Sequence, residues 1–104
     1  MRGDLYRLRS DKNTTGHEQR GPRCAVAIQS DGILLSTLIV APTSTSAQPA
    51  IFRPEIEMEG VRTRVLIDQM RAVDASRLGE LAGRLDAAET GEVDCAIRLM
   101  LGIL

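Results

Sequence analysis

One short segment holds most of the side chains that could do acid–base or phosphate chemistry. Residues 16–23 read Gly-His-Glu-Gln-Arg-Gly-Pro-Arg and lead directly into the apolar run 24–28. The segment contains the only histidine of the chain, a carboxylate, an amide and two guanidinium groups. Loops at strand ends suit such groups, because the scaffold is rigid while the polar side chains stay solvated. The sequence therefore predicts a functional loop at residues 16–23.

Several other reaction centres are not expected, because their residues are missing. One histidine and two cysteines far apart in the chain cannot form a structural zinc site. Lys12 is the only lysine and no Gly-x-x-x-x-Gly-Lys-Ser/Thr loop is present, which argues against a nucleoside triphosphatase. A Gly-x-Ser-x-Gly elbow is also missing. The remaining chemistry is acid–base and electrostatic, with no metal ion and no cofactor.

Arginine, histidine, carboxylate and hydroxyl groups together suit the cleavage of RNA by transesterification. In that reaction the 2′-hydroxyl loses a proton, attacks the adjacent phosphorus and expels the 5′-oxygen. The enzyme must supply a base, an acid and donors aimed at the phosphoryl oxygens. Arginine binds phosphate through parallel N–H groups, but its high pKa makes it a poor proton acceptor. A carboxylate or His17 is the better candidate for the base.

The charge of the chain is unevenly distributed although its net charge is only −1. Residues 1–23 carry six basic and three acidic side chains, whereas residues 74–104 carry three basic and six acidic ones. A surface that follows a phosphate backbone would use the first part, which also contains the predicted loop. The acidic end has a simpler explanation as the solvated face of a helix.

Short alternating runs predict a mainly β protein that ends in a helix. The predicted strands cover 2–9, 23–29, 33–41, 52–58 and 61–69, with a strand end and turn at 71–78 and a last strand at 81–85. Pro42 is expected to end the third strand, because proline cannot donate to a ladder. We expect a single domain over residues 1–104, with Cys24 and Cys95 as buried thiols rather than a disulfide. No apolar run approaches the roughly 18 residues of a membrane span, so a cytoplasmic protein is expected.

From about Asp86 the apolar residues follow a helical period. One stripe consists of Val93, Ala96, Ile97, Met100, Leu101 and Leu104. A second stripe beside it consists of Cys95, Leu99 and Ile103. Since one small sheet rarely covers so wide an apolar arc, the second stripe predicts an interface in a homodimer. The alternative is a helix buried deeply in its own domain.

The order of these motifs resembles that of the MazF/PemK (Kid) toxins. The similarity covers the Arg-Gly-Asp-Leu-Tyr opening, the loop at 16–23, Val-Ala-Pro-Thr-Ser at 40–44, Asp-Gln-Met-Arg-Ala-Val-Asp at 68–74 and the final helix. It implies a small SH3-like β-barrel with a C-terminal α-helix. It also implies a metal-independent, sequence-specific endoribonuclease of a type II toxin–antitoxin pair, which cuts single-stranded RNA to a cyclic phosphate and a 5′-hydroxyl. The implied partners are RNA, a MazE-like antitoxin and a second copy of the chain, with no membrane.

The resemblance also implies roles for individual residues. It gives catalytic roles to Arg23, Ser44, His17 and Asp68, and RNA contacts to Glu18, Gln19, Arg20, Thr43, Thr45, Gln69 and Arg71. Arg23 lies where MazF-type enzymes have the arginine that contacts the scissile phosphate. Ser44 lies where they have a catalytic threonine, although Thr43 and Thr45 flank it and the hydroxyl assignment stays open. The PemK branch has an arginine two residues before its aspartate, but this chain has Leu66 there, so the acid and base assignment stays open too.

Four alternatives remain at this stage. Arg23 could form a structural ion pair with Asp68 or Glu18, and residues 43–46 could be no more than a turn rich in hydroxyl groups. The chain could be a gyrase-binding toxin of the CcdB type, although it lacks the tryptophan that such toxins have near the C-terminus. It could also be a barrel that binds RNA without cutting it, although aromatic residues for base stacking are scarce.

Overall fold

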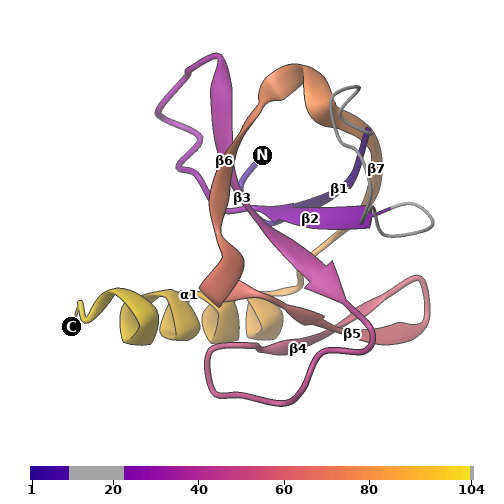
Figure 1. Cartoon of the computed structure of the whole chain (residues 1–104), viewed down its shortest axis with the longest axis vertical. Coiled ribbons are helices and arrows are strands. Elements are labelled where there is room, and N and C mark those ends of the chain that lie inside the picture. The colour runs from indigo at the N-terminus through magenta and orange to yellow at the C-terminus, as the bar shows by residue number, and fades with distance from the viewer. Residues whose placement is uncertain (10–22, 104) are drawn as a thin grey trace, which may run out of the picture.

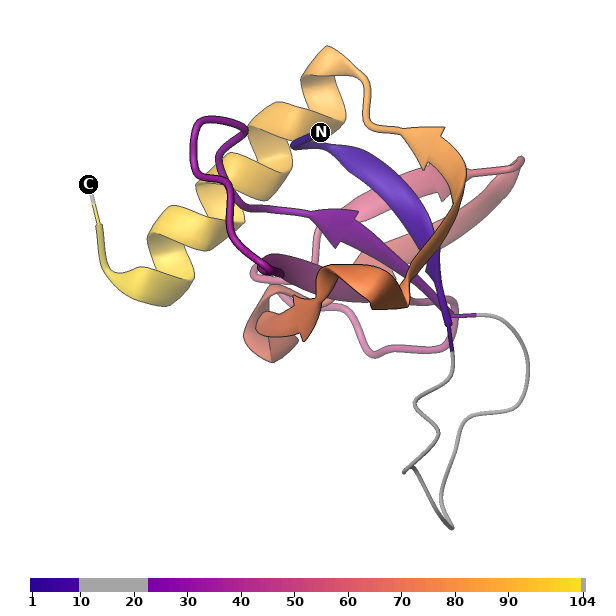
Figure 2. The ribbon, with the colours of Figure 1, turned by 90° about the horizontal axis from the view of Figure 1, so that it is seen from above.

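A computed structural model describes residues 1–9 and 23–103 as a curled sheet with one long helix beside it. Its elements are β1 (Asp4–Leu8), β2 (Arg23–Ala27), β3 (Thr37–Ser44), β4 (Glu55–Met58), β5 (Val61–Val65), the 3₁₀ helix η1 (Ile67–Gln69), β6 (Arg71–Asp74), the 3₁₀ helix η2 (Ala75–Arg77), β7 (Leu78–Arg84) and α1 (Ala87–Leu101). The sheet forms a half-barrel, and Figures 1 and 2 show α1 running along one side of it. The predicted fold class, a small β-barrel with a C-terminal helix, is confirmed.

The strand β3 organises the sheet because it pairs with three other strands along its length. The strand order is β4-β5-β3-β2-β1-β7, and β6 pairs with β3 as well. The first half of β3 pairs with β6, its middle pairs with β2, and Thr43 and Ser44 at its end pair with β5. The end of β3 is therefore held between β2 and β5, where the predicted hydroxyl-rich segment begins.

Two apolar clusters lie on opposite faces of the central strands. The larger one consists of Leu5, Val26, Ala41, Ile56, Val65, Ile67, Leu85, Val93 and Ala96, and joins the sheet to α1. The smaller one consists of Ala25, Val40 and Val73. Both clusters draw on β2 and β3, because successive residues of a strand point to opposite faces. This double burial explains why residues 24–27 are almost entirely apolar.

The third strand begins and ends several residues later in the sequence than predicted. Residues 33–35 are exposed rather than central, and Leu34 keeps 89% of its surface accessible. The strand starts at Thr37 and continues through Pro42 to Ser44. The Pro42 carbonyl accepts from the Leu66 N–H, just before η1, at 2.8 Å. The nitrogen of Pro42 faces the same side of the strand as this carbonyl. Pro42 lies between the residues of β3 that pair with β6 and those that pair with β5. The missing N–H of proline therefore costs no ladder bond.

The other predicted elements differ mainly at their boundaries. The strand expected at 52–58 begins only at Glu55, and the one expected at 61–69 ends at Val65 before η1. The last strand is longer than predicted, because it begins at Leu78. A short strand and turn within 71–78 are confirmed as β6 and η2.

The helix α1 begins where its sequence predicts, but it ends at Leu101, before Ile103 and Leu104, which were expected on its apolar stripes. Asp86 and Glu89 form a reciprocal capping box at the start, and Gly102 ends the helix in the left-handed conformation with φ 68°. Only part of the first predicted stripe is buried: Val93 and Ala96 are, whereas Met100 and Leu101 are exposed and Leu104 lies outside the described residues. Cys95 is exposed, so its predicted burial within the chain is wrong. The last turns of α1 extend past the sheet (Figure 1), which leaves this surface uncovered.

Glu89 is expected to matter for stability because both of its carboxylate oxygens hold backbone N–H groups. Oε1 accepts from Asp86 at 3.0 Å and Oε2 accepts from Glu57 of β4 at 2.8 Å, which anchors the helix start to the sheet edge. Glu89→Ala should lower the free energy of unfolding by about 1 to 2 kcal/mol. Urea unfolding followed by circular dichroism measures this. Glu92→Ala, at an exposed position one turn later, is the control, and an equal loss there would contradict the explanation.

Candidate active site

The strand register brings Arg23 and Ser44 to the same end of the sheet. Ala25 pairs with Pro42 and Val26 with Ala41, so continuing this register by two residues sets Arg23 opposite Ser44. On the other side, Ser44 pairs with Arg64 of β5. Residues directly opposite each other project from the same face of a sheet. Figure 1 shows the start of β2 and the end of β3 on one side of the molecule. Ser44 thus occupies a position beside Arg64 of β5, and the extended register puts Arg23 of β2 on its other side.

The three neighbouring hydroxyl groups have different environments. The Thr43 hydroxyl donates to the Cys24 carbonyl at 3.1 Å and so helps to hold β3 against β2. The Ser44 Oγ accepts from the Ser46 N–H at 3.2 Å and lies 3.4 Å from the Ser46 Oγ. Thr45 is exposed. The half-buried Ser44 is therefore fixed as an acceptor, and its proton can go either to Ser46 or to a bound molecule.

Asp68 is held by Arg53, a residue that the sequence reasoning missed. The Arg53 Nε donates to Asp68 Oδ1 at 3.1 Å and Nη2 donates to Oδ2 at 2.9 Å. The two side chains keep only 22% and 23% of their surface exposed. The hydrogen bonds from Arg53 lower the pKa of Asp68, outweighing the opposite effect of burial. Asp68 is thus ionised at neutral pH and is not a proton donor.

The PemK branch has an arginine at the position of Leu66. Its absence in this chain could have indicated that an arginine from another segment pairs with Asp68. In the folded chain it comes from the segment 45–54, which separates β3 from β4. Arg53 and Asp68 are fifteen residues apart in the sequence, and no local spacing rule predicts their hydrogen bonds. Asp68 was weighed from the sequence as an ion-pair partner of Arg23, and in the structure both oxygens of its carboxylate accept from Arg53.

Two further predicted residues, Gln69 and Arg71, lie on the elements η1 and β6. Gln69 follows Asp68 in η1 and is exposed. Arg71 begins β6 and pairs with Val40, four residues before Ser44 on β3. Four residues of a strand correspond to roughly 13 Å. Arg71 therefore lies along the same strand as Ser44 without being its immediate neighbour.

His17, Glu18, Gln19 and Arg20 lie outside the described residues. Their predicted roles remain predictions. Arg23, which directly follows that segment, is half-buried at the first position of β2.

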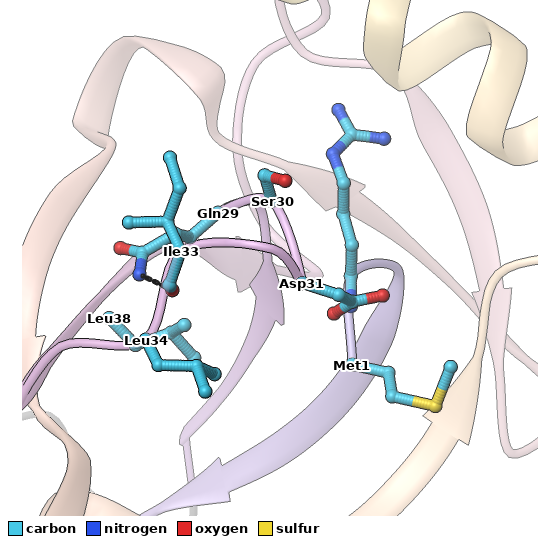
Figure 3. A pocket seen from close by; sticks show the side chains of 8 residues that line it. Met1, Gln29, Ser30, Asp31, Ile33, Leu34 and Leu38 are labelled. Atoms are coloured by element: carbon cyan, nitrogen blue, oxygen red, sulfur yellow. Dashed lines mark hydrogen bonds between the residues drawn. The ribbon is translucent and has the colours of Figure 1, made fainter.

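A cavity of about 340 Å³ lies at the opposite end of β2 and β3. Figure 3 shows its lining, with the Gln29 side chain donating to the Ile33 carbonyl at 2.8 Å. Met1, Arg2, Ser30, Asp31, Leu34 and Leu38 complete the wall. It contains none of the predicted site residues. The strand ends near Arg23 and Ser44 are therefore the candidate site, rather than this cavity.

Metal-binding groups and membrane spans were also sought in the described part of the chain. Within residues 1–9 and 23–103, no three His, Cys, Asp or Glu side chains gather closely enough to hold a metal ion. No helix among the same residues has the length and apolar character needed to cross a membrane.

Known proteins match this chain over nearly its whole length. The family model of the PemK-like, MazF-like toxins of type II toxin–antitoxin systems matches residues 1–101. A toxin candidate of Mycobacterium tuberculosis is 42% identical over 104 residues, covering 99% of this chain and 98% of its own. The endoribonuclease MazF of Staphylococcus epidermidis is 34% identical over 110 residues, covering 98% of this chain and 91% of its own.

The fold has solved counterparts as well. A mycobacterial endoribonuclease, solved in complex with its cognate antitoxin, superimposes with a TM-score of 0.82 at 15% identity. The match covers 100% of this chain and 96% of that one. The resemblance inferred from the motifs is confirmed, and the chain belongs to the PemK-like, MazF-like toxin family of type II toxin–antitoxin systems.

Proposed function

We propose that this protein is a cytoplasmic toxin that cleaves single-stranded RNA at specific sequences without a metal ion. The family and the relatives named as endoribonucleases support this activity. The observation that supports it most is the strand register, in which Ser44 pairs with Arg64 and, when the β2–β3 register is extended, faces Arg23. Two arginines on strands beside a serine suit a phosphodiester, because arginine pairs with phosphate oxygens through parallel N–H groups.

In the proposed reaction Arg23 stabilises the pentacoordinate phosphorus. Its N–H groups would donate to the phosphoryl oxygens as negative charge develops. Ser44 would donate its hydroxyl proton to an oxygen of the same phosphate. The ionised Asp68, already bonded through both oxygens, is a weak base and contributes a fixed charge. This leaves His17 as the proposed base, with Arg23 or His17 protonating the leaving 5′-oxygen.

The RNA would follow the strand ends away from Arg23. Thr43 lies on β3 and Thr45 directly follows that strand, while Gln69 and Arg71 lie on η1 and β6. All four are proposed to contact the nucleotides on either side of the cleavage site. Glu18, Gln19 and Arg20 are proposed to contact them from the adjoining segment. No single described residue identifies the base sequence that is cut.

The proposed regulator is a MazE-like antitoxin, as membership of a toxin–antitoxin family suggests. An acidic, partly disordered segment of that partner would cover the basic first part of this chain. Such a segment mimics RNA phosphates and pays an ordering cost while covering a large surface. The antitoxin would thus block access to Arg23.

The direct test is to incubate the purified protein with a single-stranded RNA in EDTA. We expect cleavage that leaves a 2′,3′-cyclic phosphate and a 5′-hydroxyl, identified by end-labelling and mass spectrometry. Cleavage that requires magnesium would contradict the mechanism. A change in RNA mobility without cutting would favour the non-catalytic RNA-binding barrel, and loss of gyrase activity without RNA cutting would favour the CcdB-type alternative.

We also propose that the protein is a homodimer through the second stripe of α1. Leu99 and Ile103 are 55% and 57% exposed, and Cys95 is exposed beside them. Grouped apolar side chains of this kind commonly mark an interface. Leu99→Glu should convert a dimer into a monomer in light scattering. Arg98→Glu, which adds negative charge about 100° around the helix, is the control and should leave the dimer intact. A monomeric wild type would contradict the proposal.

A further inference from the structure

Arg53 joins three separate segments of the chain through both its side chain and its backbone. Its guanidinium holds the Asp68 carboxylate of η1 and, through Nη1, donates to the Gln48 carbonyl at 3.2 Å. Its own carbonyl accepts from the Arg64 side chain of β5 at 3.0 Å. Its N–H donates to the Ala50 carbonyl at 2.9 Å. One residue therefore fixes the segment 45–54 against η1 and β5.

We propose that Arg53 is a positioning residue for the Ser44 hydroxyl, and that Asp68 acts in cleavage through Arg53 rather than on the RNA. The inference rests on the proposed function and adds to it a residue that neither the motifs nor the family match assigned. The bonded unit of Arg53 and Asp68 is called the latch below.

The contacts around Ser44 lead to the latch from two directions. Along the chain, the Ser44 Oγ is held by the Ser46 N–H, and Gln48, two residues further, is held by Arg53. Across the sheet, Arg64 pairs with Ser44, and its guanidinium is tied to the Arg53 carbonyl. The turn after Ser44 and the arginine beside Ser44 therefore share one anchor.

The strand itself does not depend on the latch. The Thr43 hydroxyl bonds to the Cys24 carbonyl, and the Pro42 carbonyl accepts from the Leu66 N–H. Both contacts hold β3 up to Thr43 from other elements. Partly exposed ion pairs also contribute little to folding stability. Breaking the latch should consequently release the Ser44 turn while the sheet stays folded, whereas Arg64 keeps its ion pair with Glu55 at 3.9 Å.

The kinetic test compares Arg53→Ala, Asp68→Asn and the double variant with wild type in single-turnover RNA cleavage. A misplaced group can cost up to about a hundredfold in rate, and we expect kcat to fall about tenfold to a hundredfold while KM changes by less than about threefold. The double variant should lose no more than either single variant, because both remove the same unit. Arg53→Lys should restore only part of the rate, since an ammonium cannot make both bonds to Asp68.

A matched control is Arg98→Ala, which removes one positive charge from an exposed position on α1. Its rate should stay within about threefold of wild type, because the field of an exposed, distant charge is largely screened by salt. Circular dichroism shows whether each variant is folded. Asp68→Asn keeps the shape of the side chain, and it decides the question if Arg53→Ala does not fold.

A second measurement does not depend on RNA cleavage. Hydrogen exchange of the peptide 44–54, read by mass spectrometry, should become faster in Arg53→Ala and in Asp68→Asn and stay unchanged in Arg98→Ala. If wild type cuts no RNA, the proposed function fails while the exchange still shows whether the latch holds this segment.

Three outcomes would overturn the inference. An unchanged kcat in a folded Arg53→Ala variant would remove Arg53 from the reaction. Additive losses in the double variant would mean that Asp68 acts on the RNA independently of Arg53. A lower kcat with unchanged exchange of residues 44–54 would mean that Arg53 contacts the substrate directly.

Discussion

An RNA with a 2′-deoxy sugar at the nucleotide 5′ of the scissile phosphate is expected to remain uncut by this protein. The proposed nucleophile is the 2′-hydroxyl of that nucleotide, so its removal leaves nothing to attack the phosphorus. The described residues Arg23, Ser44 and Arg64 can stabilise negative charge on a phosphate. The loss should be essentially complete, measured as the initial rate on a short chimeric oligonucleotide.

The matched control has its single 2′-deoxy sugar one nucleotide further towards the 3′ end. This substrate has the same length and charge and keeps the nucleophile, so it should be cut at a rate close to that of the all-RNA substrate. Cutting of the first oligonucleotide at the same rate would refute transesterification. In that case a water molecule would have to be the nucleophile, and the products would lack a cyclic phosphate.

The parts of the fold that follow alternation or helical period were predictable from the sequence. Residues 24–27 are apolar on both faces because β2 borders both clusters, and the sequence shows this directly. The helix start was predicted near Asp86 because the apolar residues change there to a helical period, and the structure adds a capping box of Asp86 and Glu89. Local rules of this kind work where the neighbouring residues in the chain are also neighbours in space.

The errors occurred where tertiary contacts override a local rule. Pro42 was expected to end a strand, but β3 changes partners at that point and the missing N–H is not needed. The apolar run 33–35 was expected to be central, yet it is exposed beside the cavity at the far end of the sheet. Alternation alone does not reveal which apolar run a particular sheet covers.

The candidate site shows the same division. Its hydroxyl and Arg23 were found from motifs, because both are close in sequence to recognisable strand ends. Arg64 and Arg53 were not assigned there, since one depends on the pairing of β3 with β5 and the other on a bond across fifteen residues. Residues that position a reactive group commonly come from a different segment of the chain, so they require the fold to be known.

Arg23→Ala is expected to reduce cleavage about a hundredfold to a thousandfold, the usual loss when one preorganised donor to a developing oxyanion is removed. Arg23 is half-buried at the first residue of β2, and the backbone there is paired with Leu8 of β1. A side chain on such a strand end is aimed before substrate binds, so its removal should affect kcat more than KM. Arg23→Lys should recover little, because an ammonium cannot make two parallel contacts with phosphate.

Two controls separate this effect from loss of structure and loss of charge. Circular dichroism must show a folded Arg23→Ala variant, and Arg98→Ala, which loses the same charge on α1, should cut within about threefold of wild type because exposed distant charges are screened. Ser44→Ala should reduce the rate less than Arg23→Ala if the exposed Thr45 can replace the hydroxyl, whereas Thr43 already donates to Cys24. A folded Arg23→Ala variant that cuts RNA as fast as the Arg98→Ala control would remove Arg23 from the site. The phosphate would then have to be held by Arg64 or by the residues that precede β2.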